Sequence, residues 1–139
     1  MHIAVKTLTA CAILGAGVAW YLSAPAALPQ DVAAGHQPDP ENGALVFAAS
    51  GCSSCHAAPE ATDKTVLAGG HPLVSDFGTF YAPTISWGAQ GIADWSLPEF
   101  ARALRQGVSP EGKHYYPAFP YTSYARMTDT DVADLFAYI

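Results

Sequence analysis

Basic residues are scarce in this chain of 139 residues. Six Lys and Arg stand against twelve Asp and Glu, which gives a formal net charge of −6 at pH 7. Domains that bind nucleic acids carry clustered basic side chains, whereas the few found here are scattered along the chain. We therefore expect no nucleic-acid partner.

Cysteine and methionine are also rare, with three and two residues respectively. Two of the cysteines, Cys52 and Cys55, form a single C-x-x-C pair. A structural zinc site needs four ligands, usually including a second Cys or His pair at short spacing, and no such pair follows. Apart from the initiator, Met127 is the one methionine, so the chain offers a single internal thioether.

Charge is absent from one long hydrophobic stretch, which runs from Thr7 to Gln30. As a helix, its first part up to Ala27 is about 31 Å long, close to the thickness of the bilayer's hydrocarbon core. We expect residues 1–27 to be an N-terminal transmembrane helix, with the N-terminus in the cytoplasm. A cleaved signal peptide ending near APA, or a lipoprotein acylated at Cys11, are the alternatives. All three place the remainder outside the cytoplasm.

The next segment, LPQDVAAGHQPDP, is rich in proline and poor in large apolar side chains. This composition is typical of a linker, so we expect residues 28–40 to be a tether. One domain of ordinary size then remains, from residue 41 to residue 139.

Three short helices are predicted in this domain. One covers ENGALVFAAS, and a second begins at an S-x-x-E capping box formed by Ser96 and Glu99 and stops at Gly107. The third begins at Thr128 and repeats apolar residues with helical periodicity up to Ile139. The connections between them are long and rich in aromatic residues, so three helices cannot bury them without a large apolar group at the centre.

The stretch GCSSCHAA suggests what that group is. On one helical turn, Cys52, Cys55 and His56 project from one face. Two thiols at this spacing can add to the vinyl groups of a haem while the imidazole binds the iron, and C-x-x-C-H is the attachment signature of c-type haem. A thioredoxin-like motif needs a βαβ setting that is not predicted here. A plain disulfide leaves the aromatic loops without a core.

Together with the G-x-x-x-F of Gly43 and Phe47 and the final LFAYI, this motif resembles class I cytochrome c. The stretches GGHPLVSDFGTFYAPTIS and HYYPAFPYTSYARMTD are similar to the cytochrome c subunits of membrane-associated bacterial dehydrogenases for alcohols, aldehydes or sugar acids. The resemblance implies an all-α cytochrome c fold, with short helices and long loops wrapped around one covalently bound haem c. It also implies that Gly43 and Phe47 pack against Phe136 and Tyr138.

The same resemblance implies roles for two further residues. Pro83 corresponds to a proline whose carbonyl accepts the Nδ1 proton of the proximal histidine. Met127 lies where such cytochromes supply the sixth iron ligand, with His56 as the fifth. His71 or His114 as the ligand, or no sixth ligand, are the alternatives. Candidates for hydrogen bonds to the haem propionates are Trp95, Arg105, Tyr115, Tyr116 and Tyr121.

We therefore expect an electron-transfer monohaem cytochrome c and not an enzyme. It would sit at the bacterial inner membrane with its haem domain in the periplasm, take electrons from a dehydrogenase partner and pass them to a quinone or terminal oxidase chain. A haem enzyme, or a protein that binds peroxide or gas at an open sixth position, is the alternative. The chain could also be a fragment of a multihaem protein.

Overall fold

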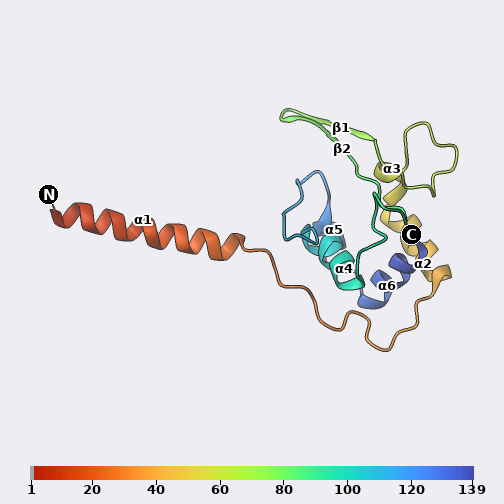
Figure 1. The fold of residues 1–139 in the computed structure, drawn as a ribbon, viewed down its shortest axis with the longest axis horizontal. Coiled ribbons are helices and arrows are strands. Elements are labelled where there is room, and N and C mark those ends of the chain that lie inside the picture. Colours follow the sequence, from red (N-terminus) through yellow and green to blue (C-terminus); the bar gives the residue numbers. More distant parts are fainter. Residues whose placement is uncertain (1) are drawn as a thin grey trace.

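The computed structural model describes residues 2–139, and its first helix extends away from the rest of the molecule (Figure 1). This helix, α1, spans His2–Ser23, and no residue in it is buried. It is long and apolar enough to cross a membrane, with a mean hydropathy of 1.6 over 18 residues. It ends before the expected boundary at Ala27, because Pro25 has no N–H to donate and disfavours the helical conformation at Ala24.

The domain that follows is mainly helical. Its elements are α2 (Pro40–Ser50), α3 (Cys52–His56), β1 (Pro72–Ser75), β2 (Gly78–Tyr81), α4 (Leu97–Gln106), α5 (Tyr121–Tyr124) and α6 (Asp129–Tyr138). Long loops join them. Of the three longer helices, α6 contacts both α2 and α4. The core is a cluster of apolar side chains from these helices and from the loops around them.

The predicted helix starts are confirmed in α4 and α6. Ser96 accepts from the Glu99 N–H while the Glu99 carboxylate accepts from the Ser96 N–H, which closes the capping box. The Thr128 side chain accepts from the Asp131 N–H at the start of α6. Helix α2 begins with Asp39 as its cap, whose carboxylate accepts two backbone N–H groups, so this boundary is set by a residue of the predicted tether.

The crossing of α2 and α6 depends on Gly43. A Cβ added there would lie 2.8 Å from the Cβ of Tyr138, so only glycine lets the two helices approach this closely. The ring of Phe47 packs on that of Tyr138 with centroids 5.3 Å apart, as expected. Phe136 instead contacts Phe100, with ring centroids 4.9 Å apart.

The all-α prediction missed a small antiparallel hairpin. Strands β1 and β2 pair in a register that places Ser75 opposite Gly78 and Pro72 opposite Tyr81. Each strand has four residues, too few for a clear alternation of apolar and polar side chains. The two turn residues are Asp76 and Phe77, which are not the Asn-Gly or Asp-Gly pairs that usually reveal a hairpin in a sequence.

The segment between α1 and α2 is packed against the domain and is not a free tether. Val32 is 8% exposed and belongs to the apolar core. His36 lies 2.6 Å from a carboxylate oxygen of Asp134, which also accepts the Asp39 N–H. Asp134 is 2% exposed, and these hydrogen bonds hold its pKa at about 2. We call residues 24–39 the strap.

Candidate functional site

The CSSCH motif forms a single turn of helix, α3, immediately after α2. Gly51 lies between the two helices with φ of 68°, a left-handed conformation that ends α2 and lets the chain change direction. Neither Cys52 nor Cys55 is in a disulfide. Burial raises the pKa of the Cys52 thiol to about 11, so this thiol is protonated at neutral pH.

The imidazole of His56 is fixed by a hydrogen bond to the backbone. Its Nδ1 lies 2.8 Å from the carbonyl oxygen of Pro83. Because a carbonyl oxygen can only accept, Nδ1 carries the proton and Nε2 keeps its lone pair. Burial lowers the pKa of His56, which also favours the neutral ring. A neutral imidazole with a free Nε2 is the form that binds iron.

The carbonyl of Pro83 is held over His56 by two short segments of chain. The Gly69 N–H donates to the His56 carbonyl at 2.6 Å, and the Gly70 N–H donates to the Ala82 carbonyl at 2.8 Å. A little further on, the Ile85 N–H donates to the Leu67 carbonyl at 3.0 Å. These bonds tie residues 67–71 to residues 82–85 beside α3.

Gly69 is a positioning residue that the sequence reasoning missed. A Cβ added at Gly69 would lie 2.6 Å from backbone atoms of Ala82, Pro83 and Thr84. Its φ of +75° is also one that other residues rarely adopt. The signal was present in the pair Gly69-Gly70, but a glycine pair alone indicates a turn and not a close approach to a particular carbonyl.

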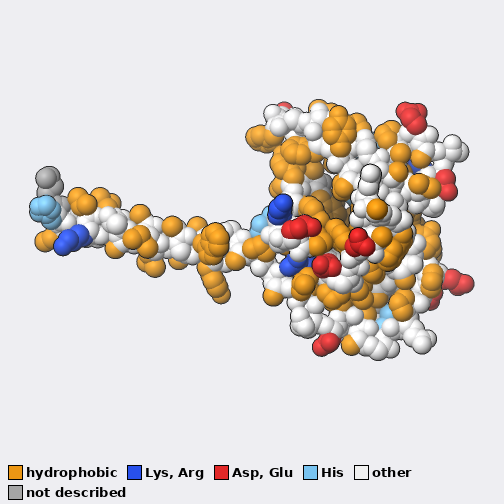
Figure 2. Space-filling view, in the orientation of Figure 1, with side chains coloured by type: hydrophobic (Ala, Val, Ile, Leu, Met, Phe, Trp, Pro, Cys, Tyr) orange, Lys and Arg blue, Asp and Glu red, His pale blue; other side chains and the backbone are white. Residues whose placement is uncertain are grey.

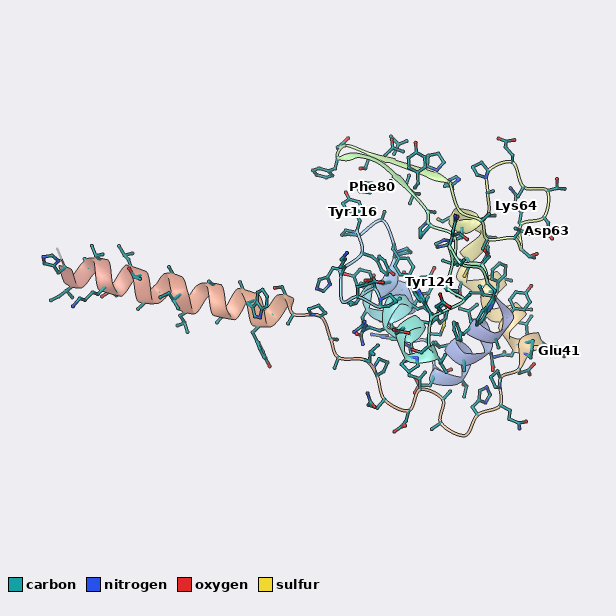
Figure 3. All side chains as sticks on the ribbon, in the orientation of Figure 1. Glu41, Asp63, Lys64, Phe80, Tyr116 and Tyr124 are labelled. Atoms are coloured by element: carbon teal, nitrogen blue, oxygen red, sulfur yellow. The ribbon has the colours of Figure 1, made fainter. Side chains whose placement is uncertain are left out.

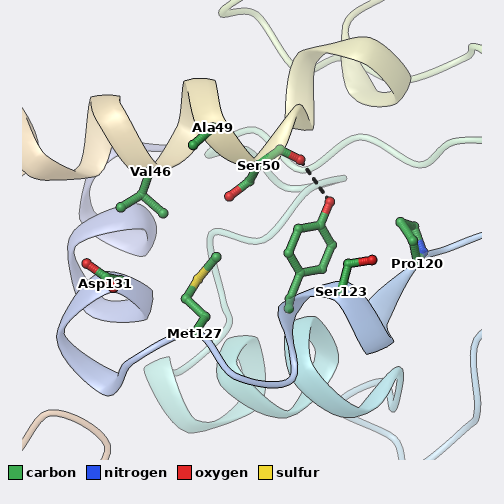
Figure 4. Close-up of a pocket in the computed structure, with 8 residues that line it drawn as sticks. Val46, Ala49, Ser50, Pro120, Ser123, Met127 and Asp131 are labelled. Carbon is green, nitrogen blue, oxygen red and sulfur yellow. Dashed lines mark hydrogen bonds between the residues drawn. The ribbon is translucent and has the colours of Figure 1, made fainter.

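Met127 points toward α2 from the segment between α5 and α6 (Figure 4). It lines a cavity of about 540 Å³ together with Val46, Ala49, Ser50, Pro120, Ser123, Tyr124 and Asp131. The Tyr124 hydroxyl donates to the Ser50 carbonyl at 2.9 Å and so ties α5 to the end of α2. Cys52, Cys55 and His56 do not line this cavity, so the pairing of Met127 with His56 stays a prediction.

Arg105 braces the segment that carries Met127. Its guanidinium donates to the Met127 carbonyl through Nη2 and to the Asp129 carboxylate through Nη1, the latter at 2.6 Å. The Nε of Arg105 is buried and has no hydrogen-bond partner among the described residues. A buried donor without an acceptor is costly, so this atom is suited to an anionic group bound nearby.

The two alternative histidine ligands lie in other surroundings. His71 lines a surface hollow with Ser53, Ser54, Ala57, Pro59 and Lys64. His114 lies 2.9 Å from the Ser23 carbonyl through its Nε2, which must therefore donate. This hydrogen bond occupies the nitrogen that most often binds iron, which disfavours His114 as a ligand.

The tyrosines proposed as propionate partners are spread around the α4–α5 connection. Burial raises the pKa of Tyr115 to about 12, so its phenol remains a neutral donor. The Tyr116 ring stacks on that of Phe80 with centroids 3.8 Å apart. Tyr121 lies under Gly107, where an added Cβ would come within 2.6 Å of its ring. Tyr116 and Tyr121 thus have structural contacts of their own.

The residues of α3 and its surroundings fit a covalently attached haem. Two thiols free of any disulfide lie one helical turn apart. The next residue is His56, whose Nδ1 donates to the Pro83 carbonyl and whose Nε2 is free. Away from α3, the buried Nε of Arg105 beside Met127 lacks an acceptor, as does the Nε of Arg102. A disulfide-exchange site would not need the histidine oriented in this way.

Comparisons with known proteins agree with this fit. The cytochrome c family model matches residues 40–139. The chain is 46% identical to a diheme cytochrome c-type protein of Cereibacter sphaeroides over 130 residues, which cover 91% of this chain and 44% of that protein. It is 38% identical to the fructose dehydrogenase cytochrome subunit of Gluconobacter japonicus over 77% of this chain and 22% of the subunit.

A third relative is the cytochrome c subunit of the alcohol dehydrogenase (quinone) of Gluconobacter oxydans. It is 34% identical over 70% of this chain, which corresponds to 20% of the subunit. The chain therefore spans less than half the length of each of these three relatives. Two of them are named as cytochrome subunits of dehydrogenases.

Proposed function

The chain belongs to the cytochrome c family, and from that premise we propose that it is a monohaem electron carrier that serves a dehydrogenase. The haem is attached through Cys52 and Cys55, and its iron is bound by His56 and Met127. When bound, the haem supplies one-electron transfer between ferric and ferrous iron. One haem is proposed for this chain because GCSSCH occurs once in its sequence.

The observation that carries this proposal is the hydrogen bond from His56 Nδ1 to the Pro83 carbonyl. It fixes the tautomer and the ring orientation, and it raises the basicity of the nitrogen that faces the metal. Gly69 keeps the Pro83 carbonyl in place by leaving room for residues 82–84. Arg105 holds the backbone of Met127 by donating to its carbonyl oxygen.

We further propose that the domain is a periplasmic one held at the inner membrane by α1. This placement is supported by α1, which is long and apolar enough to cross a membrane. A dehydrogenase is the proposed electron donor because relatives are named as cytochrome subunits of fructose and alcohol dehydrogenases. A quinone or a terminal oxidase chain is the proposed acceptor.

The competing function is a haem enzyme or a peroxide- or gas-binding protein, which requires an open sixth position on the iron. Visible spectroscopy of the purified, matured chain separates the two. An electron carrier shows low-spin iron with a methionine band near the red end of the ferric spectrum and does not bind carbon monoxide readily. High-spin iron that takes up carbon monoxide on mixing would favour the enzyme.

The partner is tested by affinity purification of the tagged chain from detergent-solubilised membranes of its own cells. We expect a dehydrogenase subunit to co-purify and its substrate to reduce the cytochrome. A second sample carrying Cys52→Ser and Cys55→Ser is the control, since it should lack substrate-dependent reduction. Reduction by the substrate that is equally fast in a membrane preparation without the dehydrogenase would contradict the proposed donor.

A further inference from the structure

The β1–β2 hairpin exposes an apolar surface that no other described element covers. Phe77 in its turn is 84% exposed, Val74 is 82% exposed and Tyr81 is 67% exposed. In the observed register, Val74 and Tyr81 point to the same face of the hairpin, while Leu73 and Phe80 point to the other. Large apolar groups exposed together mark a surface that contacts a membrane or another protein.

The inner face fixes the hairpin to the domain. Leu73 and Phe80 are half-buried, and the Phe80 ring stacks on that of Tyr116 with centroids 3.8 Å apart and planes 15° apart. Figure 3 shows this pair between the hairpin and the loop that joins α4 to α5. The position of the hairpin is therefore tied to that loop.

The same loop contacts the end of α1. Two residues along from Tyr116, the Nε2 of His114 donates to the Ser23 carbonyl at 2.9 Å. Trp20 and Tyr21, in the last turn of α1, are residue types that favour the interface between membrane and water. The end of α1, the loop and the base of the hairpin thus form one continuous series of contacts.

The hairpin also points in the required direction. Its tip and the α4–α5 loop lie on the side of the domain from which α1 extends (Figure 1). Figure 2 shows hydrophobic side chains at the end of the hairpin on that side. A bilayer crossed by α1 therefore has its surface next to the hairpin tip.

We propose that the hairpin tip is a second membrane contact, in which Phe77, with Val74 and Tyr81 behind it, enters the interfacial layer of the bilayer that α1 crosses. The inference rests on the membrane placement proposed above. Asp76 is the one charge in the sequence PLVSDFGTFY, and it is acidic, so the contact is apolar and does not depend on attraction to anionic lipids.

This second contact would restrict how the domain moves. Helix α1 alone would let the domain rotate about the helix axis, whereas two attachment points on one side do not. The strap adds to this effect, because Val32 and His36 are packed against the domain. The face that carries α3 would then keep a constant direction relative to the membrane.

Spin-label accessibility in the full, haem-loaded chain tests the proposal in lipid nanodiscs. The native chain is labelled at Cys11, and Cys11→Ala chains carry Phe77→Cys, Val74→Cys or Glu41→Cys. Glu41 is exposed and lies on the side of the domain away from α1 (Figure 3). A Cys11→Ala chain without a new cysteine shows how much label reaches Cys52 and Cys55, and the visible spectrum shows that each variant is folded.

We expect the label at position 77 to collide more often with oxygen, which concentrates in lipid, than with a water-soluble nickel complex. The label at position 41 should show the reverse. Because the contact is apolar, the result at position 77 should not change in about 1 M salt. A label at Val74→Cys should behave like the one at position 77.

A lipid-exposed label at Cys11 shows that α1 is in the bilayer. Given that result, either of two findings at position 77 would overturn the proposal. One is ready access of nickel to position 77. The other is protection of position 77 from both reagents, which would assign the hairpin to a protein partner. If Cys11 itself is accessible to nickel, the membrane placement fails, and the hairpin contact fails with it.

Discussion

Replacement of Gly69 by alanine should weaken the domain far more than the same change at its neighbour Gly70. Both residues have positive φ, +75° and +87°, so alanine at either position is strained by about 1 kcal/mol. Only at Gly69 does the added Cβ meet other atoms. It would lie 2.6 Å from backbone atoms of three successive residues, Ala82, Pro83 and Thr84, whereas nothing lies within 4 Å at Gly70.

The difference between the two variants therefore measures the close approach alone. Forcing one methyl group into a packed site costs about 1–3 kcal/mol, and here the neighbours are backbone atoms that cannot rotate away. A central value of about 2 kcal/mol corresponds to a difference of roughly 10 °C in Tm for a domain of about 100 residues. Thermal unfolding of both haem-loaded variants, followed by circular dichroism, provides the measurement.

A second measurement on the same pair tests the link to the iron site. Moving residues 82–84 away weakens the hydrogen bond from His56 Nδ1, which makes the imidazole less basic and less able to stabilise the ferric state. Gly69→Ala should therefore raise the reduction potential, and Gly70→Ala should leave it unchanged. Equal losses of stability in the two variants, with equal potentials, would refute the role given to Gly69.

Three further changes have distinct expected outcomes. Met127→Ala should convert low-spin iron into high-spin iron that binds carbon monoxide. The control Val46→Ala, which shortens another side chain of the same cavity, should leave the visible spectrum unchanged. An unchanged spectrum in Met127→Ala would remove Met127 from the iron ligands. The pKa of Asp134 is about 2, below the ordinary value near 4, so its bonds to His36 and the Asp39 N–H contribute stability that is present above about pH 4 and lost as the pH falls towards 2. Asp134→Asn should thus be less stable than the native chain at pH 7 and lose less stability on acidification. Urea unfolding of both chains at several pH values measures this, and the same dependence of stability on pH in both would contradict it. Ser96→Ala removes the cap of α4 and should cost about 1 kcal/mol in urea unfolding, and an unchanged midpoint would show that the cap contributes nothing.

Local sequence signals predicted the helices that hold the core. The capping box at Ser96 and the cap at Thr128 act within one turn of helix, so neighbouring residues contain all the information needed. The same holds for the turn of α3, where the spacing of Cys52, Cys55 and His56 places them close together. The contact between His56 and Pro83 spans 27 residues and was accessible only through the family resemblance.

The features that were missed depend on contacts between distant segments. The strap reads as a linker because it is rich in proline, yet Val32 and His36 find partners in elements that follow much later in the chain. Gly69 is unusual only because residues 82–84 pass beside it. The hairpin has no strong turn signal, and its pairing is supported by the stack of Phe80 on Tyr116.

The central claim is that one haem is joined to the chain through both thiols of CSSCH. Intact-protein and peptide mass spectrometry of the chain, matured in cells that assemble c-type cytochromes, tests it most directly. We predict one haem for each chain, bound to the peptide that contains Cys52 and Cys55, with neither thiol open to alkylation. A matured chain without added haem mass, in which both thiols react with the alkylating reagent, would contradict the claim.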